Sequence, residues 1–485
     1  MQRRGGLRPA SSLLGTVSHF ALFRTLRMYL LYSLILALLF ALMLPYFLYQ
    51  ALRHGKYADS FRERLGRLPD ALGDDGRPTV WIHTVSVGEF LAAKPLIDRI
   101  REEFAGWRVI VSTTTATGQR LAREQQPGRF DGVCYFPFDW LFSVRRALDH
   151  IKPSLVVILE TELWPNFLRE CRRRQIITII TNGRISPRSF ARYQRVSRLI
   201  QRALTDVSLL VMQSAADAER ARALGASEVR VCGNLKYDVP MIDGTPQATD
   251  AQSQIASEID RQFALLSSHQ LIVAGSTAPG EEKMLLAALT EIRRQRGLEE
   301  TRLLVAPRHP ERFKEVANLI AQSGFRYACR SAIRASAAAG NPSSAPAKAS
   351  AAAVAEAPSA DIILLDTIGE LAAVYRFASV VFVGGSLVPR GGHNIIEPAV
   401  FARAIIVGPH TENFRQIVAD FVEADAVVQV PATGEDIAGA FTRALTRLLA
   451  DNEAAQAMGA RARQILLMNR GATRCTVAAI RERMR

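Results

Sequence analysis

The chain has 485 residues, of which 48% are hydrophobic and 22% are charged, and its formal net charge is +15. That length corresponds to about three domains' worth of chain, and the composition is typical of a packed protein rather than a disordered one. Its five cysteines form no CxxC pair or Cys/His cluster, which excludes a disulfide scaffold, a zinc module and an iron–sulfur protein and favours a reduced protein that faces the cytoplasm.

Much of the positive charge lies at the N-terminus. Residues 1–67 hold ten Lys and Arg residues against two acidic residues, yet Met28–Tyr49 is an uncharged, Leu-rich run of 22 residues. As a helix this run would reach about 33 Å, enough for a hydrocarbon core of about 30 Å. The sequence therefore predicts a basic leader (1–27), a membrane anchor (28–52) and contact with anionic head groups, rather than binding to nucleic acid.

Other interpretations of this run remain. A cleaved signal peptide is disfavoured, because its apolar region spans roughly 7–15 residues and a small-residue cleavage site should follow. A buried core helix is the plainer alternative. Pro45 leaves a half-inserted, monotopic helix open, and basic residues on both sides of the run prevent the positive-inside rule from giving an orientation.

From residue 80 onward, short apolar runs alternate with amphipathic stretches such as Glu89–Phe104 and Ala215–Leu224. Strands separated by helices imply parallel sheets with right-handed crossovers. The strands expected in the first half are Val80–Val85, Val109–Thr113, Val133–Phe136, Leu155–Leu159, Ile176–Ile180 and Leu209–Met212. Those expected in the second half are Leu271–Ala274, Arg302–Ala306, Ile362–Leu365, Val380–Val383, Ile405–Val407 and Ala426–Val430.

A polar stretch, Asp243–Gln254, separates these halves. The pattern predicts an α/β protein with two Rossmann-like, doubly wound domains facing a cleft, one over 53–245 and one over 246–485. Residues 331–360 contain 14 alanines and interrupt the second half. We expect a low-complexity surface insertion there, disordered or a frayed helix, with no chemistry.

Polar and glycine-rich loops follow the predicted strands. In open α/β sheets, ligands bind at the carboxyl ends of the strands, so we expect these loops to line one active cleft. The loops are Ser86–Glu89, Glu160–Pro165, Thr181–Arg184, Gly233–Lys236, Gly275–Thr277, Pro307–Pro310, Thr367–Glu370 and Gly384–Ser386.

The segment Gly384–Pro398 is the most specific feature. Its glycines allow close approach to the backbone, and N–H groups at a helix start near Asn394 would favour a phosphate. Glu397, one turn later, could accept hydrogen bonds from ribose hydroxyls, and Arg308 with His309 could clamp the phosphate. The alternatives are a turn with a helix cap and a solvated arginine.

Several cofactor and metal signatures are missing from the sequence. No G-x-G-x-x-G follows the first strand, no G-x-x-x-x-G-K-[ST] or D-x-D occurs, and the eight histidines show no metal-ligand spacing. These absences disfavour a dehydrogenase, a P-loop enzyme and a metal-dependent glycosyltransferase. We therefore expect neither a metal nor a cofactor.

Glu89 is the first candidate for acid–base chemistry. Its spacing from Ser86 is that of a capping box, in which the glutamate only satisfies a backbone N–H group. Alternatively it is a general base: the dipole of a helix starting here favours the ionised carboxylate, which takes a proton from a hydroxyl, and Gly88 leaves room for substrate. The sequence leaves both interpretations open.

Glu160, Glu162 and Lys236 follow other strands. Successive side chains of a strand point to opposite faces, so we do not expect the two glutamates to form a dyad, and we expect Glu160 to face the cleft. Lys236 could neutralise charge in a transition state or be an exposed loop residue without a role. We expect His83 and Trp164 to be packing residues.

Taken in order, these segments resemble the 3-deoxy-D-manno-octulosonic acid (Kdo) transferases of lipid A assembly. The resemblance covers roughly residues 28–470. Its segments are the Leu-rich anchor, His83-Thr-Val-Ser-Val-Gly-Glu89, Glu160-Thr-Glu-Leu-Trp-Pro-Asn166, Gly233-Asn-Leu-Lys236, Pro307-Arg-His-Pro-Glu-Arg312, Ile368-Gly-Glu370 and Gly391-Gly-His-Asn-Ile-Ile-Glu-Pro398.

The resemblance implies an inverting, metal-independent glycosyltransferase of the GT-B type on the cytoplasmic face of the inner membrane. The implied donor is CMP-Kdo, and the implied acceptor is lipid IVA, a tetra-acylated disaccharide bisphosphate. Position by position, Glu89 corresponds to the general base, and Glu160 and Lys236 to transition-state stabilisers. The implied CMP-binding residues are Pro307, Arg308, Ile368, Gly369, Glu370, Asn394, Ile395, Ile396 and Glu397.

The basic leader and the Ala-rich insertion depart from the family pattern, and the insertion lies between two segments of the implied CMP site. Two other classes compete with the transferase: an epimerase-like nucleotide-sugar enzyme and an inactive, membrane-anchored scaffold. An epimerase acting on soluble substrates gains nothing from an anchor. A scaffold has no reason to place a carboxylate, a lysine and an anion-binding loop at strand ends.

Overall fold

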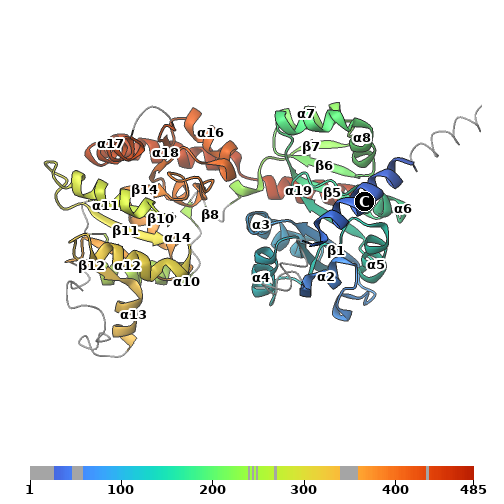
Figure 1. Cartoon of the computed structure of the whole chain (residues 1–485), viewed down its shortest axis with the longest axis horizontal. Coiled ribbons are helices and arrows are strands. Elements are labelled where there is room, and N and C mark those ends of the chain that lie inside the picture. Colours follow the sequence, from blue (N-terminus) through green and yellow to red (C-terminus); the bar gives the residue numbers. More distant parts are fainter. Residues whose placement is uncertain are drawn as a thin grey trace, which may run out of the picture. The chain divides into compact units, whose positions relative to one another are not determined.

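The computed structural model describes residues 27–45, 58–238, 241–242, 245–246, 250–266, 270–338, 359–432 and 436–485. The chain divides into two compact units. Unit 1 comprises Met1–Asp238 and Gly471–Arg485, and unit 2 comprises Val239–Arg470 (Figure 1). Residues 1–26 of the predicted leader, residues 46–52 of the predicted anchor and most of the Ala-rich insertion (339–358) lie outside the described residues.

Unit 1 is built on a seven-stranded sheet in the order β3-β2-β1-β4-β5-β6-β7, with every neighbouring pair parallel. Its strands are β1 (Thr79–Thr84), β2 (Arg108–Thr113), β3 (Gly132–Tyr135), β4 (Leu155–Leu159), β5 (Ile177–Gly183), β6 (Leu209–Met212) and β7 (Val229–Val231). The helices around it are α2 (Ala58–Arg64), α3 (Val87–Glu103), α4 (Ala116–Gln125), α5 (Leu141–Ile151), α6 (Pro165–Arg173), α7 (Pro187–Arg195), α8 (Ser197–Thr205) and α9 (Ala215–Ala223). The doubly wound prediction is confirmed.

Both faces of this sheet are covered. Along β1, Trp81 packs into one hydrophobic cluster, whereas Val80 and Ile82 pack into another. Since successive side chains of a strand point to opposite faces, the two clusters lie on the two faces of the sheet. A strand buried on both faces needs an unbroken apolar run rather than an alternating one, which is why the sequence shows these strands clearly.

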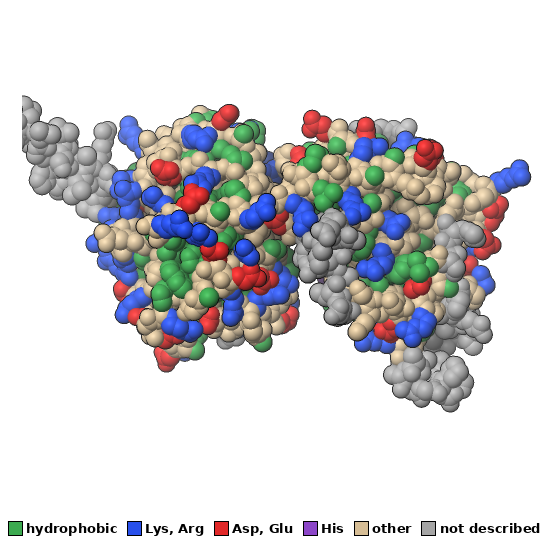
Figure 2. Space-filling model, turned by 180° about the vertical axis from the view of Figure 1, so that it is seen from behind, with side chains coloured by type: hydrophobic (Ala, Val, Ile, Leu, Met, Phe, Trp, Pro, Cys, Tyr) green, Lys and Arg blue, Asp and Glu red, His purple; other side chains and the backbone are tan. Residues whose placement is uncertain are grey.

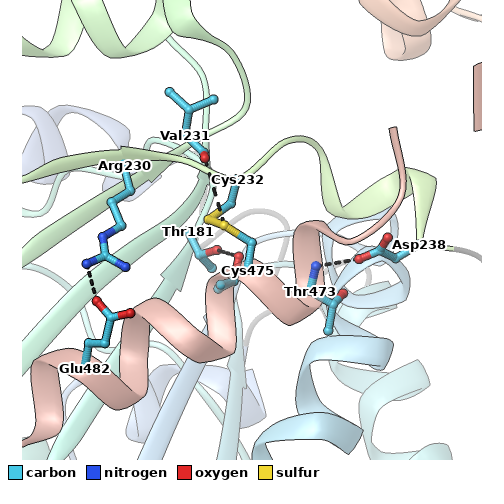
Figure 3. Close-up of a disulfide and its surroundings, with 9 residues drawn as sticks. Thr181, Arg230, Val231, Cys232, Asp238, Thr473, Cys475 and Glu482 are labelled. Carbon is cyan, nitrogen blue, oxygen red and sulfur yellow. Dashed lines mark hydrogen bonds and ion pairs between the residues drawn. A yellow bond between two sulfur atoms is a disulfide. The ribbon is translucent and has the colours of Figure 1, made fainter. Parts of the chain in front are cut away.

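Unit 1 is completed by the last helix of the chain, α19 (Ala472–Met484), which packs on α3 and β5. Our expectation that residues 246–485 form one domain is therefore wrong for its last fifteen residues, 471–485. Val477 and Ile480 lie in the same cluster as Val80. The backbone N–H groups of Gly471 and Thr473 donate to the carboxylate of Asp238. Figure 3 shows the contact between Thr473 and Asp238.

A disulfide joins α19 to the end of β7, which corrects the expectation of reduced cysteines. Cys232 and Cys475 have their Cα atoms 5.5 Å apart, although 243 positions separate them along the chain. An Arg230–Glu482 ion pair flanks the disulfide (Figure 3). The free cysteines Cys134 and Cys171 are buried.

Unit 2 contains a second seven-stranded parallel sheet, in the order β12-β13-β11-β10-β14-β15-β16. Its strands are β10 (Leu271–Thr277), β11 (Arg302–Pro307), β12 (Tyr327–Cys329), β13 (Ile362–Leu364), β14 (Val380–Val383), β15 (Ala404–Val407) and β16 (Val428–Gln429). Its helices are α10 (Asp250–Phe263), α11 (Glu281–Ile292), α12 (Phe313–Ala321), α13 (Arg330–Ala338), α14 (Leu371–Val374), α15 (Ile396–Val400), α16 (Arg415–Glu423), α17 (Ile437–Ala450) and α18 (Asn452–Asn469). The predicted insertion thus begins as a helix, α13.

A buried carboxylate shapes the glycine-rich loop that follows β14. Glu281, at the start of α11, is completely buried. One of its oxygens accepts hydrogen bonds from the backbone N–H groups of Ser386 and Leu387, both at 2.9 Å, and the other from those of Ala278 and Gly385, both at 2.8 Å. This carboxylate therefore holds the loop in one conformation.

Among the described residues, one helix is long and apolar enough to cross a membrane. It spans Arg27–Pro45 and has a mean hydropathy of 2.2, and its large aliphatic side chains from Leu30 to Leu44 are mostly exposed. It matches the predicted anchor as far as Pro45.

The placement of α19 can be tested by unfolding. Ile480→Ala should lower the free energy of unfolding of unit 1 by about 2–5 kcal/mol, because it leaves a cavity in a buried cluster. All four tryptophans lie in unit 1, so urea unfolding followed by tryptophan fluorescence reports on this unit. Arg483→Ala, on the exposed side of α19, is the control. An unchanged midpoint for Ile480→Ala would show that α19 does not support unit 1.

The role of Glu281 is tested by Glu281→Ala. Four buried N–H groups would lose their acceptor, and each unsatisfied buried donor costs about 1–3 kcal/mol, so we expect unit 2 to lose about 3 kcal/mol or more of stability. Differential scanning calorimetry measures the loss. Glu291→Ala, at an exposed position of the same helix, should leave the transition within about 0.5 kcal/mol of wild type. Equal melting of both variants would contradict the role assigned to Glu281.

Candidate functional site

The candidate site of unit 1 lies where its strand order reverses. The chain runs outward from β1 through β2 to β3 and returns to β4 on the other side of β1. Ligands of open α/β sheets bind outside the carboxyl ends of strands at such a switch point. Glu89 follows β1 and Glu160 follows β4, so the fold brings these two predicted residues to the same place.

Glu89 makes the interactions of a helix cap. Ser86 is the N-cap of α3, and its hydroxyl accepts from the N–H of Glu89 at 3.4 Å. The Glu89 carboxylate in turn accepts from the Ser86 hydroxyl at 3.0 Å and from the N–H of Val85 at 2.8 Å. The capping interpretation is thus correct. The same hydrogen bonds hold the carboxylate in position at the edge of the sheet.

The protonation of Glu89 differs from the expectation based on the helix dipole. Its pKa is raised to about 7, mainly by burial and also by the negative charges of Glu160 and Glu162. The hydrogen bonds from Val85 and Ser86 act in the opposite direction and lower it. Desolvation outweighs the N-terminal position on α3. A pKa near neutrality suits a general base, because the group is available to take a proton and strong enough to hold it.

Space is open beside Glu89. A Cβ atom added to Gly88 would come no closer than 4.0 Å to another atom, the Ser86 hydroxyl. The expectation that Gly88 leaves room at this point agrees with that geometry.

Glu160 and Lys236 form an ion pair, with Nζ and Oε1 3.6 Å apart. Glu160 has a φ of 57°, and its N–H donates to the carbonyl of Thr181 at 2.8 Å. The loop of Lys236 is held by Asn182, whose side-chain oxygen accepts from the N–H of Leu235 at 2.9 Å. The loops after β4 and β7 and the end of β5 are thereby connected at one edge of the sheet.

Glu162 belongs to the same group, which the sequence analysis missed. Burial and the charge of Glu160 raise the pKa of Glu162, and Glu162 in turn raises the pKa of Glu89. We expected the two glutamates on opposite faces because strand side chains alternate. The strand ends at Leu159, however, and the positive φ of Glu160 turns the backbone, so the alternation no longer applies.

His83 and Trp164 are packing residues, as expected. His83 is completely buried, stacks on Phe136 with ring centroids 3.9 Å apart, and has a pKa lowered to about 3 by burial. Trp164 packs against the same core, with its ring centroid 5.6 Å from that of Phe136.

The candidate site of unit 2 also lies at the carboxyl ends of its strands. Arg308 directly follows β11, and its N–H donates to the carbonyl of Thr277 at 3.1 Å. Asn394 donates to Glu397 at 3.2 Å and accepts from the N–H of Ile396 at 3.1 Å. Arg308 lowers the pKa of Glu397, although burial raises it more. Arg308, Asn394 and Glu397 thus lie near one another.

The predicted phosphate site needs correction in one respect. The N–H groups of Gly385, Ser386 and Leu387 are taken by Glu281, and α15 has only five residues. The loop and the helix start therefore offer less to an anion than the sequence suggested. The positive charge of Arg308 is therefore the main feature that would attract an anion. Burial, together with the nearby Arg308 and His309, lowers the pKa of His393 to about 4, so His393 is neutral and adds no positive charge.

Glu370 is engaged in a buried ion pair. Its carboxylate receives two hydrogen bonds from Arg330, at 3.0 and 3.1 Å, and one from the hydroxyl of Thr367 at 2.5 Å. Arg330 is completely buried and also donates to Glu258 at 3.0 Å. The side chain of Glu370 thus holds its loop in place. Glu370 could therefore contact a ligand only through its backbone, or help to position other residues of the loop.

The remaining predicted CMP residues differ in exposure. Ile368 is 79% exposed, and the adjacent Gly369 has a φ of 85°. Ile395 and Ile396 are buried, so they can offer a ligand only backbone atoms. Pro307 ends β11.

Within the described residues, no group of three or more His, Cys, Asp or Glu side chains is arranged to hold a metal ion.

Comparisons with known proteins show which family this chain resembles. Residues 59–239 match the sequence family described as 3-deoxy-D-manno-octulosonic-acid transferase (kdotransferase). The chain is 31% identical over 423 residues to the 3-deoxy-D-manno-octulosonic acid transferase of Haemophilus influenzae, covering 85% of this chain and 89% of that one. It is 32% identical over 409 residues to the enzyme of the same name from Bordetella pertussis, covering 83% and 87%.

The solved structure of a glycosyltransferase from Rickettsia africae is similar with a TM-score of 0.50 at 10% identity, over 84% of this chain and 99% of that one. This likeness shows the fold, which is the two-domain α/β fold of the GT-B type. With the family match and the identities above, it follows that the chain belongs to the 3-deoxy-D-manno-octulosonic acid transferase family and is a glycosyltransferase.

Proposed function

We propose that this enzyme transfers Kdo from CMP-Kdo to lipid IVA, with inversion at the anomeric carbon and without a metal ion. The observation that carries the proposal is the group formed by Glu89, whose pKa lies near 7, and the Glu160–Lys236 ion pair at the switch point of unit 1. Family membership supports the sugar that is transferred. The direct test is incubation of purified enzyme with both substrates and measurement of the product mass.

Unit 1 is assigned to acceptor activation. Glu89 takes the proton from a sugar hydroxyl of the acceptor while that oxygen attacks the anomeric carbon of Kdo. Val85 and Ser86 hold the carboxylate in place through hydrogen bonds, so the base is pre-positioned. Lys236, paired with Glu160, supplies a fixed positive charge for the negative charge that develops during transfer.

Unit 2 is assigned to the donor. Arg308 would meet the phosphate of CMP as it leaves, and Glu397, oriented by Asn394, would accept hydrogen bonds from the ribose. Charge-assisted hydrogen bonds from arginine to phosphate are stronger than neutral ones. Glu370 and Arg330 keep the neighbouring loop in shape.

We also propose that the enzyme is attached to the cytoplasmic face of the inner membrane. The apolar helix Arg27–Pro45 supports attachment. The proposed donor is a nucleotide sugar of the cytosol, so the catalytic units must lie on the cytoplasmic face of the membrane. On the face shown in Figure 2, Lys and Arg side chains are scattered among acidic, apolar and other side chains. Nucleic acid is not proposed as a partner.

Glu89→Gln separates a base from a cap. Glutamine keeps the size of the side chain and most of its hydrogen bonding but cannot take the proton. We expect single-turnover transfer to fall by about 10²–10⁴-fold, with CMP-Kdo affinity and melting temperature nearly unchanged. Wild-type transfer should rise with pH through the pKa of about 7, because only the deprotonated carboxylate accepts a proton.

Ser86→Ala is the matched control for that experiment. It removes the N-cap hydroxyl and one hydrogen bond that positions Glu89, at a cost of about 1 kcal/mol of stability. It leaves the carboxylate able to accept a proton, so transfer should fall far less than in Glu89→Gln. A Glu89→Gln rate within about threefold of wild type would contradict the assignment of the base, given the loss expected.

Donor binding is tested with two variants and two ligands. Arg308→Ala should weaken CMP binding by about 10- to 100-fold, the value of a hydrogen bond to a charged group, and leave cytidine binding unchanged. Glu397→Ala should weaken both, because both ligands carry the ribose. Isothermal titration calorimetry gives the four affinities.

Glu423→Ala, at the exposed end of α16, is the control and should bind CMP as wild type does. If Arg308→Ala loses equal affinity for CMP and cytidine, Arg308 does not contact the phosphate. If Glu397→Ala binds both ligands normally, Glu397 has no role in ribose recognition.

A further inference from the structure

The helix Arg27–Pro45 packs along the side of unit 1 through its polar residues. The Tyr29 hydroxyl donates to Asp206 and the Tyr32 hydroxyl to Asp139, each at 2.9 Å. The hydroxyl of Ser33 accepts from Asn166 at 3.1 Å. Residues three and four apart share one side of a helix, so this side faces the protein.

The contact continues along the helix. The ring of Phe40 lies 6.1 Å from that of Phe61, 5.8 Å from that of Phe138 and 4.8 Å from that of Trp140, measured between centroids. From Tyr29 to Phe40 the helix rises about 16 Å. More than half of the helix is therefore in contact with the folded unit.

The opposite side of the helix is wholly apolar and exposed. Its large side chains are between 38% and 76% exposed: Leu30, Leu31, Leu34, Ile35, Leu38, Leu39, Leu42, Met43 and Leu44. A surface helix of a protein in water turns its apolar side inward and its polar side outward. This helix does the reverse, so its outer side is suited to an apolar surrounding.

The docking surface of unit 1 is formed by buried polar groups. Asp139 is 4% exposed, accepts from the N–H groups of Asn166 at 3.0 Å and Phe167 at 2.7 Å, and has a pKa raised to about 7 by burial. Asp206 is 3% exposed. Removing the helix would leave the Tyr29 and Tyr32 hydroxyls without these acceptors, which opposes undocking in an apolar medium.

Arginines lie beside both ends of the docked stretch. Near the first end, the Arg169 guanidinium is 4.4 Å from the ring centroid of Tyr29. Near the other end, the Arg64 guanidinium is 5.7 Å from the ring centroid of Phe138, which contacts Phe40. If the docked helix crossed a bilayer, the contact of about 16 Å would bring at least one of these charges into the hydrocarbon, at a cost of several kcal/mol.

We propose that the helix Arg27–Pro45 stays docked on unit 1 and lies in the plane of an anionic bilayer. Its leucine side enters the boundary between head groups and acyl chains, while Arg169, beside Tyr29, meets the anionic head groups. The enzyme is then monotopic, and unit 1 touches the membrane directly. The inference deepens the membrane attachment proposed above and names its geometry and its lipid partner.

Depth measurements test this geometry. Leu31→Cys, Ile35→Cys and Leu42→Cys, each made in the full chain with Cys329→Ser, are labelled with a nitroxide and bound to phosphatidylglycerol vesicles. A helix in the plane gives all three labels a similar depth, about 5–10 Å below the head groups. A spanning helix places Ile35 deepest, about 6–8 Å below the other two, and that pattern would overturn the proposal.

Vesicle binding supplies a second test with matched variants. The double change Leu34→Ser and Leu38→Ser should weaken binding to phosphatidylglycerol vesicles by at least about tenfold, because it removes two lipid-facing leucines. Leu91→Ser, at a 46% exposed leucine of α3, should bind as wild type does. Replacing phosphatidylglycerol by phosphatidylcholine should weaken binding of all forms.

The remaining outcomes also decide. If full-length protein fails to bind vesicles but forms dimers that the Leu34/Leu38 change dissociates, a second copy covers the leucine side and the proposal fails. Transfer to a detergent-dispersed acceptor is measured on every variant. Normal transfer with failed vesicle binding would reject the membrane geometry alone, whereas lost transfer by wild type would reject the proposed function.

Discussion

All strands of each seven-stranded sheet run parallel, and this constraint determines where the chemistry of the enzyme can lie. Every strand of a sheet ends at the same edge, so loops far apart in the sequence are brought together there. In unit 1 the residues after β1, β4, β5 and β7 meet in this way, although about 150 positions separate Glu89 from Lys236. The buried apolar strands provide the rigid base on which these polar loops are held.

Buried carboxylates serve two purposes in this protein. Glu281 and Glu370 are surrounded by donors, four backbone N–H groups in one case and an arginine and a threonine in the other. Such groups stabilise loop conformations. Glu89 has fewer donors and two acidic neighbours, so its pKa rises to about 7. The same kind of side chain is thus structural or reactive according to how many donors surround it.

Most of the fold could be predicted from the sequence because the signal is local. β4 is five consecutive aliphatic residues, all buried, and strands of this kind were found within a few residues. β7 was missed because it is short and half exposed, and β12 because it has three residues. The disulfide and the position of α19 depend on pairs separated by more than 230 positions, which no local pattern reveals.

The sequence predicted which residues belong to the candidate site better than it predicted their contacts. The motifs identified Glu89, Glu160, Lys236, Arg308 and Glu397, but not which partners each would have. The side chain of Glu370 pairs with Arg330, at the border of a segment that looked like a structureless insertion. The donors of the glycine loop are taken by Glu281, a residue with no unusual sequence context. Such partners become visible only when the chain is folded.

The return of the chain to unit 1 has a consequence for synthesis on the ribosome. After Asp238 the whole of unit 2, Val239–Arg470, must be made before α19 emerges to cover its face of the first sheet. At about 5–20 residues per second this takes roughly 10–50 seconds. During that time the apolar surface later covered by Val477 and Ile480 is exposed, and Cys232 has no partner. The nascent first unit is therefore a natural client for chaperones, and a message truncated just before α19 would leave unit 2 complete but unit 1 without its last helix.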